Sequence, residues 1–158
     1  QWQIKQIDDS PYVKLINRYS GKCLDVAYGS TADGANIQQW HYEGENQQWE
    51  LTPELELEQD VSEKETYYLL KNRKSGKCVD VSDASTDDAA NVQQWGHTPY
   101  GHENQLWKLE KVDTGDNGEA YYKIINLNSG KCLDVEGWST DDAGNIHQYE
   151  YKGQKKTI

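Results

Sequence analysis

One segment of this sequence sets the architecture of the chain: Tyr12-Val13-Lys14-Leu15-Ile16-Asn17-Arg18-Tyr19-Ser20-Gly21-Lys22-Cys23-Leu24-Asp25-Val26. It returns as YYLLKNRKSGKCVDV over residues 67–81 and as YYKIINLNSGKCLDV over residues 121–135. The three copies follow one another at nearly equal intervals. Repetition of this kind indicates an architecture in which each repeat is one supersecondary unit that needs its neighbours to bury its apolar face.

Composition narrows the classes of protein that fit. The chain has 158 residues, a formal net charge of −11, six Trp and eleven Tyr. Nucleic acids and anionic membranes are disfavoured as partners, because phosphate binding needs clustered Lys and Arg. No apolar run reaches the roughly 18 residues that a membrane span needs. The length fits a single domain over residues 1–158, which we expect to be a monomer, and the first residue, Gln1, suits a processed or excised segment.

The cysteines occupy one equivalent position in each copy, at Cys23, Cys78 and Cys132. Their number is odd, and positions related by a threefold axis lie too far apart to form disulfides, so we expect three buried thiols that behave as small apolar residues. The sequence has no Cys-x-x-Cys, and its four histidines follow no ligand spacing. It therefore predicts neither a metal site nor a cofactor, and the cysteines do not settle the compartment.

Each unit contains four short segments typical of strands, separated by turn residues. The first is a β-rich run such as residues 121–125, followed by a turn that ends in Gly, where a positive φ is tolerated. The second carries the Cys-x-Asp-Val motif. Third strands are predicted at residues 37–40, 92–95 and 146–149, and fourth strands over residues 46–51 and 104–109.

Three units of four strands predict an all-β protein with the β-trefoil fold, a closed barrel of pseudo-threefold symmetry with a hairpin cap. A propeller also has four strands per blade, but three blades fall below its usual range. The repeats are expected at residues 12–52, 67–110 and 121–158. The third repeat lacks a fourth strand, and Gln1-Trp2-Gln3-Ile4 matches Gln48-Trp49-Glu50-Leu51. We therefore predict that residues 1–5 complete the third repeat.

The order Gly-Lys-Cys-Leu-Asp-Val, then Gln-x-Trp, then Asn-Gln-x-Trp resembles the ricin B-type lectin repeat over nearly the whole chain. Within that superfamily it is most similar to the family-13 carbohydrate-binding modules of bacterial glycoside hydrolases. The resemblance implies one shallow sugar site per repeat. The residues carried over are Asp25, Gln38, Trp40, Asn46 and Gln47 in the first unit, Asp80, Gln93, Trp95, Asn104 and Gln105 in the second, and Asp134, His147 and Tyr149 in the third.

The third unit departs from this pattern, because His147 stands where Gln is expected, and Lys155 and Lys156 stand near the places of Asn and Gln. The chemistry suits the other assignments: a carboxylate accepts hydrogen bonds from adjacent sugar hydroxyls, and an aromatic ring covers the apolar face of a pyranose. Structural roles remain open. Trp49 and Trp107 fit core positions better than ligand contacts, and the three Asp residues could cap turns.

The resemblance implies non-catalytic binding of a polysaccharide, either galactose-containing or of the xylan or arabinan type, by a secreted, extracellular module that targets an attached glycoside hydrolase. An alternative is a free-standing lectin or toxin-targeting subunit that binds cell-surface galactosides. A trefoil that binds protein through inactive sugar sites is a further alternative. An enzyme is not expected, because glycosidases use two neighbouring carboxyl groups and each unit offers one repeated Asp with no second repeated acid beside it.

Overall fold

The computed structural model describes residues 1–58, 60 and 63–153, and over these residues the chain is all-β. The strands are β1 (Trp2–Gln6), β2 (Tyr12–Asn17), β3 (Cys23–Val26), β4 (Ile37–Trp40), β5 (Trp49–Glu58), β6 (Lys64–Asn72), β7 (Cys78–Val81), β8 (Val92–Trp95), β9 (Trp107–Thr114), β10 (Ala120–Asn126), β11 (Cys132–Val135) and β12 (Ile146–Tyr149). Single 3-10 turns lie between them at η1 (Ala27–Gly29), η2 (Glu45–Gln47), η3 (Ser82–Ala84), η4 (Glu103–Gln105) and η5 (Glu136–Trp138). None of these helical turns is long and apolar enough to cross a membrane.

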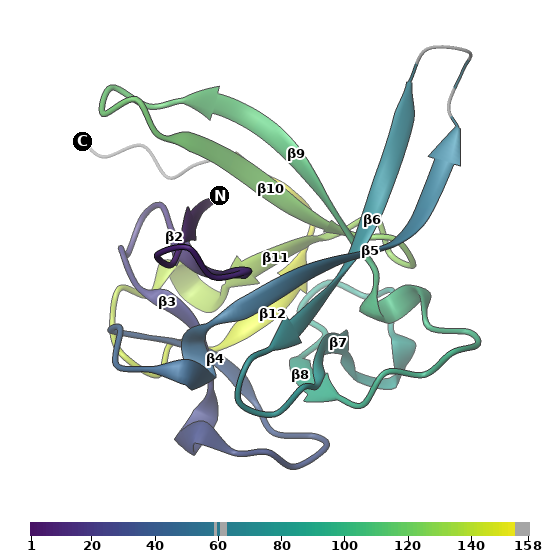
Figure 1. The fold of residues 1–158 in the computed structure, drawn as a ribbon, viewed down its shortest axis with the longest axis horizontal. Helices are drawn as coiled ribbons and strands as arrows, with labels where there is room; N and C mark the ends of the chain where they lie inside the picture. Colours follow the sequence, from purple (N-terminus) through teal and green to yellow (C-terminus); the bar gives the residue numbers. More distant parts are fainter. Residues whose placement is uncertain (59, 61–62, 154–158) are drawn as a thin grey trace.

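Six strands form a closed barrel. β1 pairs with β2, β2 with β5, β5 with β6, β6 with β9, β9 with β10, and β10 again with β1, all antiparallel. Figure 1 shows the β5–β6 and β9–β10 hairpins extending from the same side of the molecule. The barrel closes near Trp2, Trp49 and Trp107, where neighbouring hairpins pair, whereas the outer parts of the β5–β6 and β9–β10 hairpins pair only within each hairpin.

The other six strands form three hairpins that cap the barrel: β3–β4, β7–β8 and β11–β12. Each hairpin follows a turn that its Asn and Gly residues stabilise. In the first unit the side-chain oxygen of Asn17 accepts hydrogen bonds from the backbone of Tyr19 and Ser20, and Gly21 has a φ of 72°. The predicted threefold trefoil is confirmed, including the glycine that permits a positive φ.

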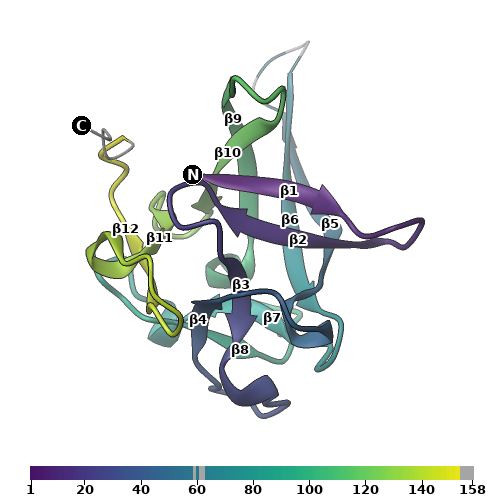
Figure 2. The ribbon, with the colours of Figure 1, turned by 90° about the vertical axis from the view of Figure 1, so that its left-hand side faces the viewer.

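The N-terminal strand completes the third unit, as the sequence predicted. Figure 2 shows β1 lying along β2, and Trp2 pairs with both Asn17 of β2 and Tyr122 of β10. The indole nitrogen of Trp2 donates a 3.0 Å hydrogen bond to the carbonyl oxygen of Leu133. The same bond joins Trp49 to Leu24 in the first unit and Trp107 to Val79 in the second.

The core has the threefold order of the sequence. Trp2, Trp49 and Trp107 are completely buried, which confirms that Trp49 and Trp107 are core residues. The other main core positions come in sets of three, one per unit: Leu15, Leu70 and Ile124; Leu24, Val79 and Leu133; Val26, Val81 and Val135; Ile37, Val92 and Ile146. The three cysteines are buried free thiols as expected, and burial raises the pKa of each to about 11.

The fourth strands begin later than predicted. Residues 46 and 47 belong to turn η2 and residues 104 and 105 to turn η4, so β5 starts at Trp49 and β9 at Trp107. The amide side chains of these turn residues bond to the preceding hairpin and to the backbone around it, which bends the chain away from an extended path. Strand β5 continues to Glu58 through residues 54–58, where Glu and Leu alternate, and Leu55 and Leu57 pack against the cluster that contains Tyr67 and Leu69.

Buried amides join the three units to one another. The middle Gln of each third strand reaches the loop of a neighbouring unit: Gln39 donates to the carbonyl oxygens of Ser139 and Asp141. Gln94 and Gln148 repeat the contact, with the loops of the first and second units respectively. A second set of contacts is less buried: the side chains of Asn36, Asn91 and Asn145, which are partly or fully exposed, form a ring in which each amide donates to the next.

Candidate functional site

The cap hairpins set the predicted site residues on one face. In an antiparallel pair, directly opposed residues point to the same side, and so do residues two apart. Asp25 opposes Gln38, and Cys23 opposes Trp40. Leu24 and Val26 point the other way, into the core. The registers of β7–β8 and β11–β12 are the same, so Asp80 opposes Gln93 and Asp134 opposes His147.

The first cluster is organised around the carboxylate of Asp25. Its Oδ1 accepts a 3.0 Å hydrogen bond from Gln38, and its Oδ2 accepts a 3.0 Å bond from Asn46. The amide of Asn46 also donates to the carbonyl oxygen of Val26, which ties turn η2 to the end of β3. Gln47 is completely buried and bonds to the backbone of Glu43, Gly44 and His41. Gln47 therefore holds the backbone beside the Asp25 cluster in place and does not face solvent.

The second cluster has the same design with one more contact. Gln93 donates to Oδ1 of Asp80 at 3.1 Å, and Asn104 and Gln105 both donate to Oδ2, at 3.1 and 3.0 Å. Gln105 is buried and also donates to the carbonyl oxygen of Gly96. The structure thus brings together the predicted residues of the second unit, with the two turn amides on one carboxylate oxygen.

Burial sets the protonation chemistry of both carboxylates. Asp25 is only 3% exposed, and burial raises its pKa from an ordinary 3.8 to about 6, although the amides of Gln38, Asn46 and Gln47 oppose the shift. Burial also raises the pKa of Asp80 against the same kind of amide donors. Each carboxylate is held in one orientation by amide hydrogen bonds, as an acceptor for hydroxyl groups requires.

An aromatic side chain flanks each cluster at the surface. Trp40 and Tyr149 are half-buried, and Trp95 is 41% exposed, in contrast to the completely buried Trp49 and Trp107. Trp95 lies against the loop of the first unit, because a side chain at Gly34 would meet its ring at 3.7 Å. These rings have the partial exposure that a flat apolar contact surface needs.

The third cluster differs as the sequence indicated. Oδ2 of Asp134 lies 2.8 Å from Nε2 of His147, which takes the place of the glutamine, and the ring of His147 stacks on Tyr149. The side chain of Asp134 is 49% exposed. Lys155 and Lys156 lie outside the described residues. A cavity of about 290 Å³ opens here, lined by Asp134, Trp138, His147, Tyr149 and Tyr151 among others.

Aspartates of neighbouring units fix the end of each third strand. Directly after each aromatic residue, a backbone N–H donates to an aspartate from a neighbouring unit: His41 to Asp142, Gly96 to Asp33 and Glu150 to Asp88. These aspartates were not predicted, although each follows the cysteine of its unit at the same spacing, which was a usable signal. Tyr28 and Trp138 follow the Asp strands with positive φ values of 59° and 57°, and Tyr28 is fully exposed. A positive φ is uncommon for bulky residues, and Trp138 is also exposed.

The fold and these clusters define a lectin-type β-trefoil. The family model described as a ricin-type β-trefoil lectin domain-like matches residues 1–61 and 45–149, and the chain belongs to this family.

Among solved structures, the designed threefold-symmetric protein ThreeFoil is similar with 46% identity and a TM-score of 0.75, over 92% of this chain and 93% of that chain. An exo-β-1,3-galactanase from Clostridium thermocellum is similar with 39% identity and a TM-score of 0.74, over 94% of this chain and 29% of the enzyme. The clotting factor G alpha subunit of Tachypleus tridentatus is 43% identical over 47 residues, which is 30% of this chain and 7% of that protein. The chain therefore spans less than a third of these two natural proteins.

Proposed function

We propose that this protein is a non-catalytic carbohydrate-binding module that binds a polysaccharide through the clusters around Asp25 and Asp80. The observation that carries the proposal is the fixed carboxylate beside a partly exposed tryptophan, found twice with the same amide partners. A carboxylate whose two oxygens both accept amide hydrogen bonds is suited to accept hydroxyl groups as well. It differs from the pair of carboxyl groups that glycoside hydrolysis uses.

Galactose-containing polysaccharides are the proposed ligands. A domain 39% identical to this chain occurs within an enzyme named as an exo-β-1,3-galactanase, where it accounts for under a third of the length. We therefore infer that this module serves an attached glycoside hydrolase, and we propose that it is secreted and acts as a monomer. Xylan and arabinan are the other polymers to test.

Weak individual sites suffice for this role. Each cluster is a small surface feature, so one sugar unit gains few contacts. A repetitive polymer can occupy two clusters of one molecule, and the second contact then forms at a high effective concentration. Affinity for a polymer should therefore exceed affinity for its monosaccharide.

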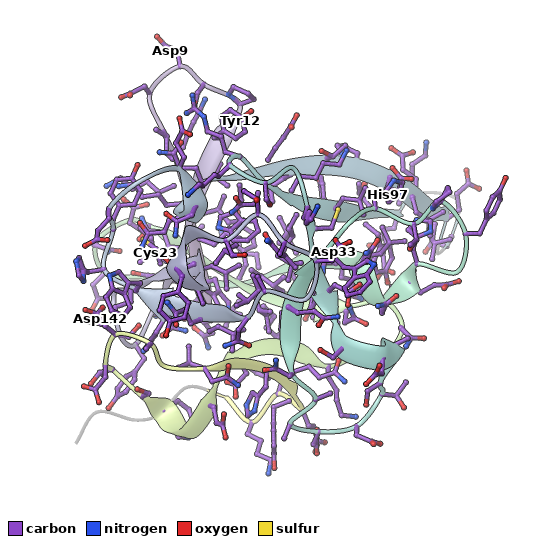
Figure 3. All side chains as sticks on the ribbon, turned by 90° about the horizontal axis from the view of Figure 1, so that it is seen from below. Asp9, Tyr12, Cys23, Asp33, His97 and Asp142 are labelled. Atoms are coloured by element: carbon purple, nitrogen blue, oxygen red, sulfur yellow. The ribbon has the colours of Figure 1, made fainter. Side chains whose placement is uncertain are left out.

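Affinity electrophoresis on a panel of galactan, arabinogalactan, xylan and arabinan tests the proposal. We expect retardation on a galactose-containing polymer, reduced by Asp25→Ala or Asp80→Ala and lost in the double variant. Asp9→Ala is the matched control, because it removes one acidic side chain from the exposed turn between β1 and β2, away from the cap (Figure 3). No retardation on any polymer, together with binding to galactose-terminated cell-surface glycans, would favour a free-standing lectin.

A further inference from the structure

Three side chains with metal-binding chemistry come together on the second unit. Glu54 comes from β5, and His97 and His102 come from the loop between β8 and η4. One nitrogen of each ring and one carboxylate oxygen of Glu54 lie within 4.8 Å of one another. Nε2 of His97 is 3.6 Å from Oε1 of Glu54, and Nε2 of His102 is 3.9 Å from the same oxygen. Four residues separate His97 from His102, which is within the His-x3–5-His spacing of zinc ligands, so the expectation that the histidines follow no ligand spacing was wrong for this pair. Glu54 belongs to a separate part of the chain, and only the fold brings it to the histidines.

The distances are close to those of a zinc site. Zinc binds imidazole nitrogens at about 2.0–2.1 Å and carboxylate oxygens at about 2.0–2.2 Å, so neighbouring donors of a tetrahedral site are about 3.3 Å apart. The separations of the His97 and His102 nitrogens from Glu54 Oε1, 3.6 and 3.9 Å, exceed this value by less than 1 Å. Two imidazoles favour zinc over calcium or magnesium, which prefer oxygen ligands. Water can complete the tetrahedron, because a third of the Glu54 and His97 side chains is exposed.

The ring nitrogens of His102 are a second indication of a metal site, because they are buried without hydrogen-bond partners among the described residues. Its side chain is only 17% exposed, and neither of its ring nitrogens has a hydrogen-bond partner within the described part of the chain. The ring meets that of His97 edge to face, with the centroids 5.1 Å apart. Buried polar atoms normally have partners, so an imidazole without one points to a ligand that it would bind.

The loop that carries the histidines is already fixed at both ends. Gln105 donates its backbone N–H to the carbonyl oxygen of His102 and its side-chain amide to that of Gly96. In the first unit, residues 41–45 join Trp40 to Asn46, whereas the longer segment 96–103 joins Trp95 to Asn104. The histidine pair is thus a feature of the second unit and not part of the threefold pattern.

We propose that Glu54, His97 and His102 bind a zinc ion that fastens the 96–103 loop to strand β5. The test is a Co²⁺ titration of tag-free, chelator-treated protein followed by absorption spectroscopy, because tetrahedral Co²⁺ gives intense visible bands, and then displacement by Zn²⁺. We expect bands that saturate at one equivalent and disappear when zinc is added. His97→Ala and Glu54→Gln should lose the saturable bands.

His41→Ala is the matched control, since it removes a histidine whose ring binds Asp142 on the opposite side of the molecule from His97 (Figure 3). It should keep the full titration. Absence of saturable bands in the parent protein, or bands that survive His97→Ala and Glu54→Gln, overturns the proposal. Thermal melts of the metal-free variants establish that each one folds. No sugar is present in the titration, so its failure is distinct from failure of the proposed polysaccharide binding.

Discussion

The side-chain amide of Asn36 donates a 2.9 Å hydrogen bond to the side-chain oxygen of Asn145, a residue of another unit. Asn91 closes the ring, so each of the three amides has one donor and one acceptor engaged. Asn36→Ala removes two hydrogen bonds of a partly exposed ring, and we expect it to lower the free energy of unfolding by about 1 kcal/mol. Urea denaturation measures the loss. The double variant Asn36→Ala/Asn145→Ala should lose less than the sum of the single variants, and strict additivity would contradict a cooperative ring.

Trp2 is expected to be as important for stability as the tryptophans inside the chain. It is completely buried and bonds to Leu133 of the third unit. Trp2→Ala should lower the free energy of unfolding by about 3–5 kcal/mol, and deletion of residues 1–5 should cost at least as much. Gln3→Ala on the same strand is the control, because that side chain is only partly buried. Equal denaturation midpoints for the parent and Trp2→Ala would show that β1 does not hold the barrel closed.

Alanine substitutions of Trp95 and Trp107 should affect different properties: the first should weaken sugar binding, and the second should lower stability. Trp95→Ala removes a partly exposed ring beside Asp80, so we expect about tenfold weaker binding to the polysaccharide identified by electrophoresis, with a stability change below about 1 kcal/mol. Trp107→Ala opens a cavity in the core and should destabilise the protein by about 3–5 kcal/mol. Denaturation and titration of both variants check the contrast. A Trp95→Ala variant that binds normally would remove this ring from the site.

The raised pKa of Asp25 makes the stability of the protein depend on pH. Burial raises this pKa from 3.8 to about 6, and the nearby carboxylate of Glu43 adds to the shift. Between about pH 4 and 6 the folded protein binds more protons than the unfolded chain, so the free energy of unfolding falls as the pH rises through that window and levels off above it. Asp80, whose pKa burial also raises, contributes with the same sign.

Urea denaturation at pH 4, 5, 6 and 7 should show this decline for the parent protein and a smaller decline for Asp25→Asn. Binding should follow the opposite trend, because the ionised carboxylate is the stronger acceptor of hydroxyl groups. Polymer affinity is therefore expected to rise between pH 5 and 7. An Asp25→Asn variant with the same pH slope as the parent would show that Asp25 does not titrate in this range.

Much of the fold could be predicted from the sequence, because the repeat places the same residue types at the same spacing three times. The residues of the first two clusters were predicted from the resemblance to the ricin B-type lectin repeat. The early start assigned to the fourth strands was wrong, because Asn46 and Asn104 use their side chains to hold a turn instead of extending the sheet. The alternation of apolar and polar residues that predicts a strand does not show that an Asn side chain holds a turn.

Contacts between units were beyond sequence reasoning for a different reason. Gln39 lies between two predicted site residues, yet its side chain points inward and binds a loop far away in the chain. The meeting of Glu54 with His97 depends in the same way on the path of a loop whose length no repeat constrains. The replacement of glutamine by His147 was visible, but its contact with Asp134 emerged only from the hairpin register.

The buried glutamines form a closed cycle: Gln39 of the first unit holds the loop of the third, Gln148 of the third holds that of the second, and Gln94 of the second holds that of the first. No unit has a complete set of contacts without both others, so the three hairpins cannot shift independently. These contacts therefore fix the distances between Asp25, Asp80 and Asp134. A polymer that reaches two of them must present its sugars at that interval, so polymer conformation, as well as sugar identity, governs selectivity.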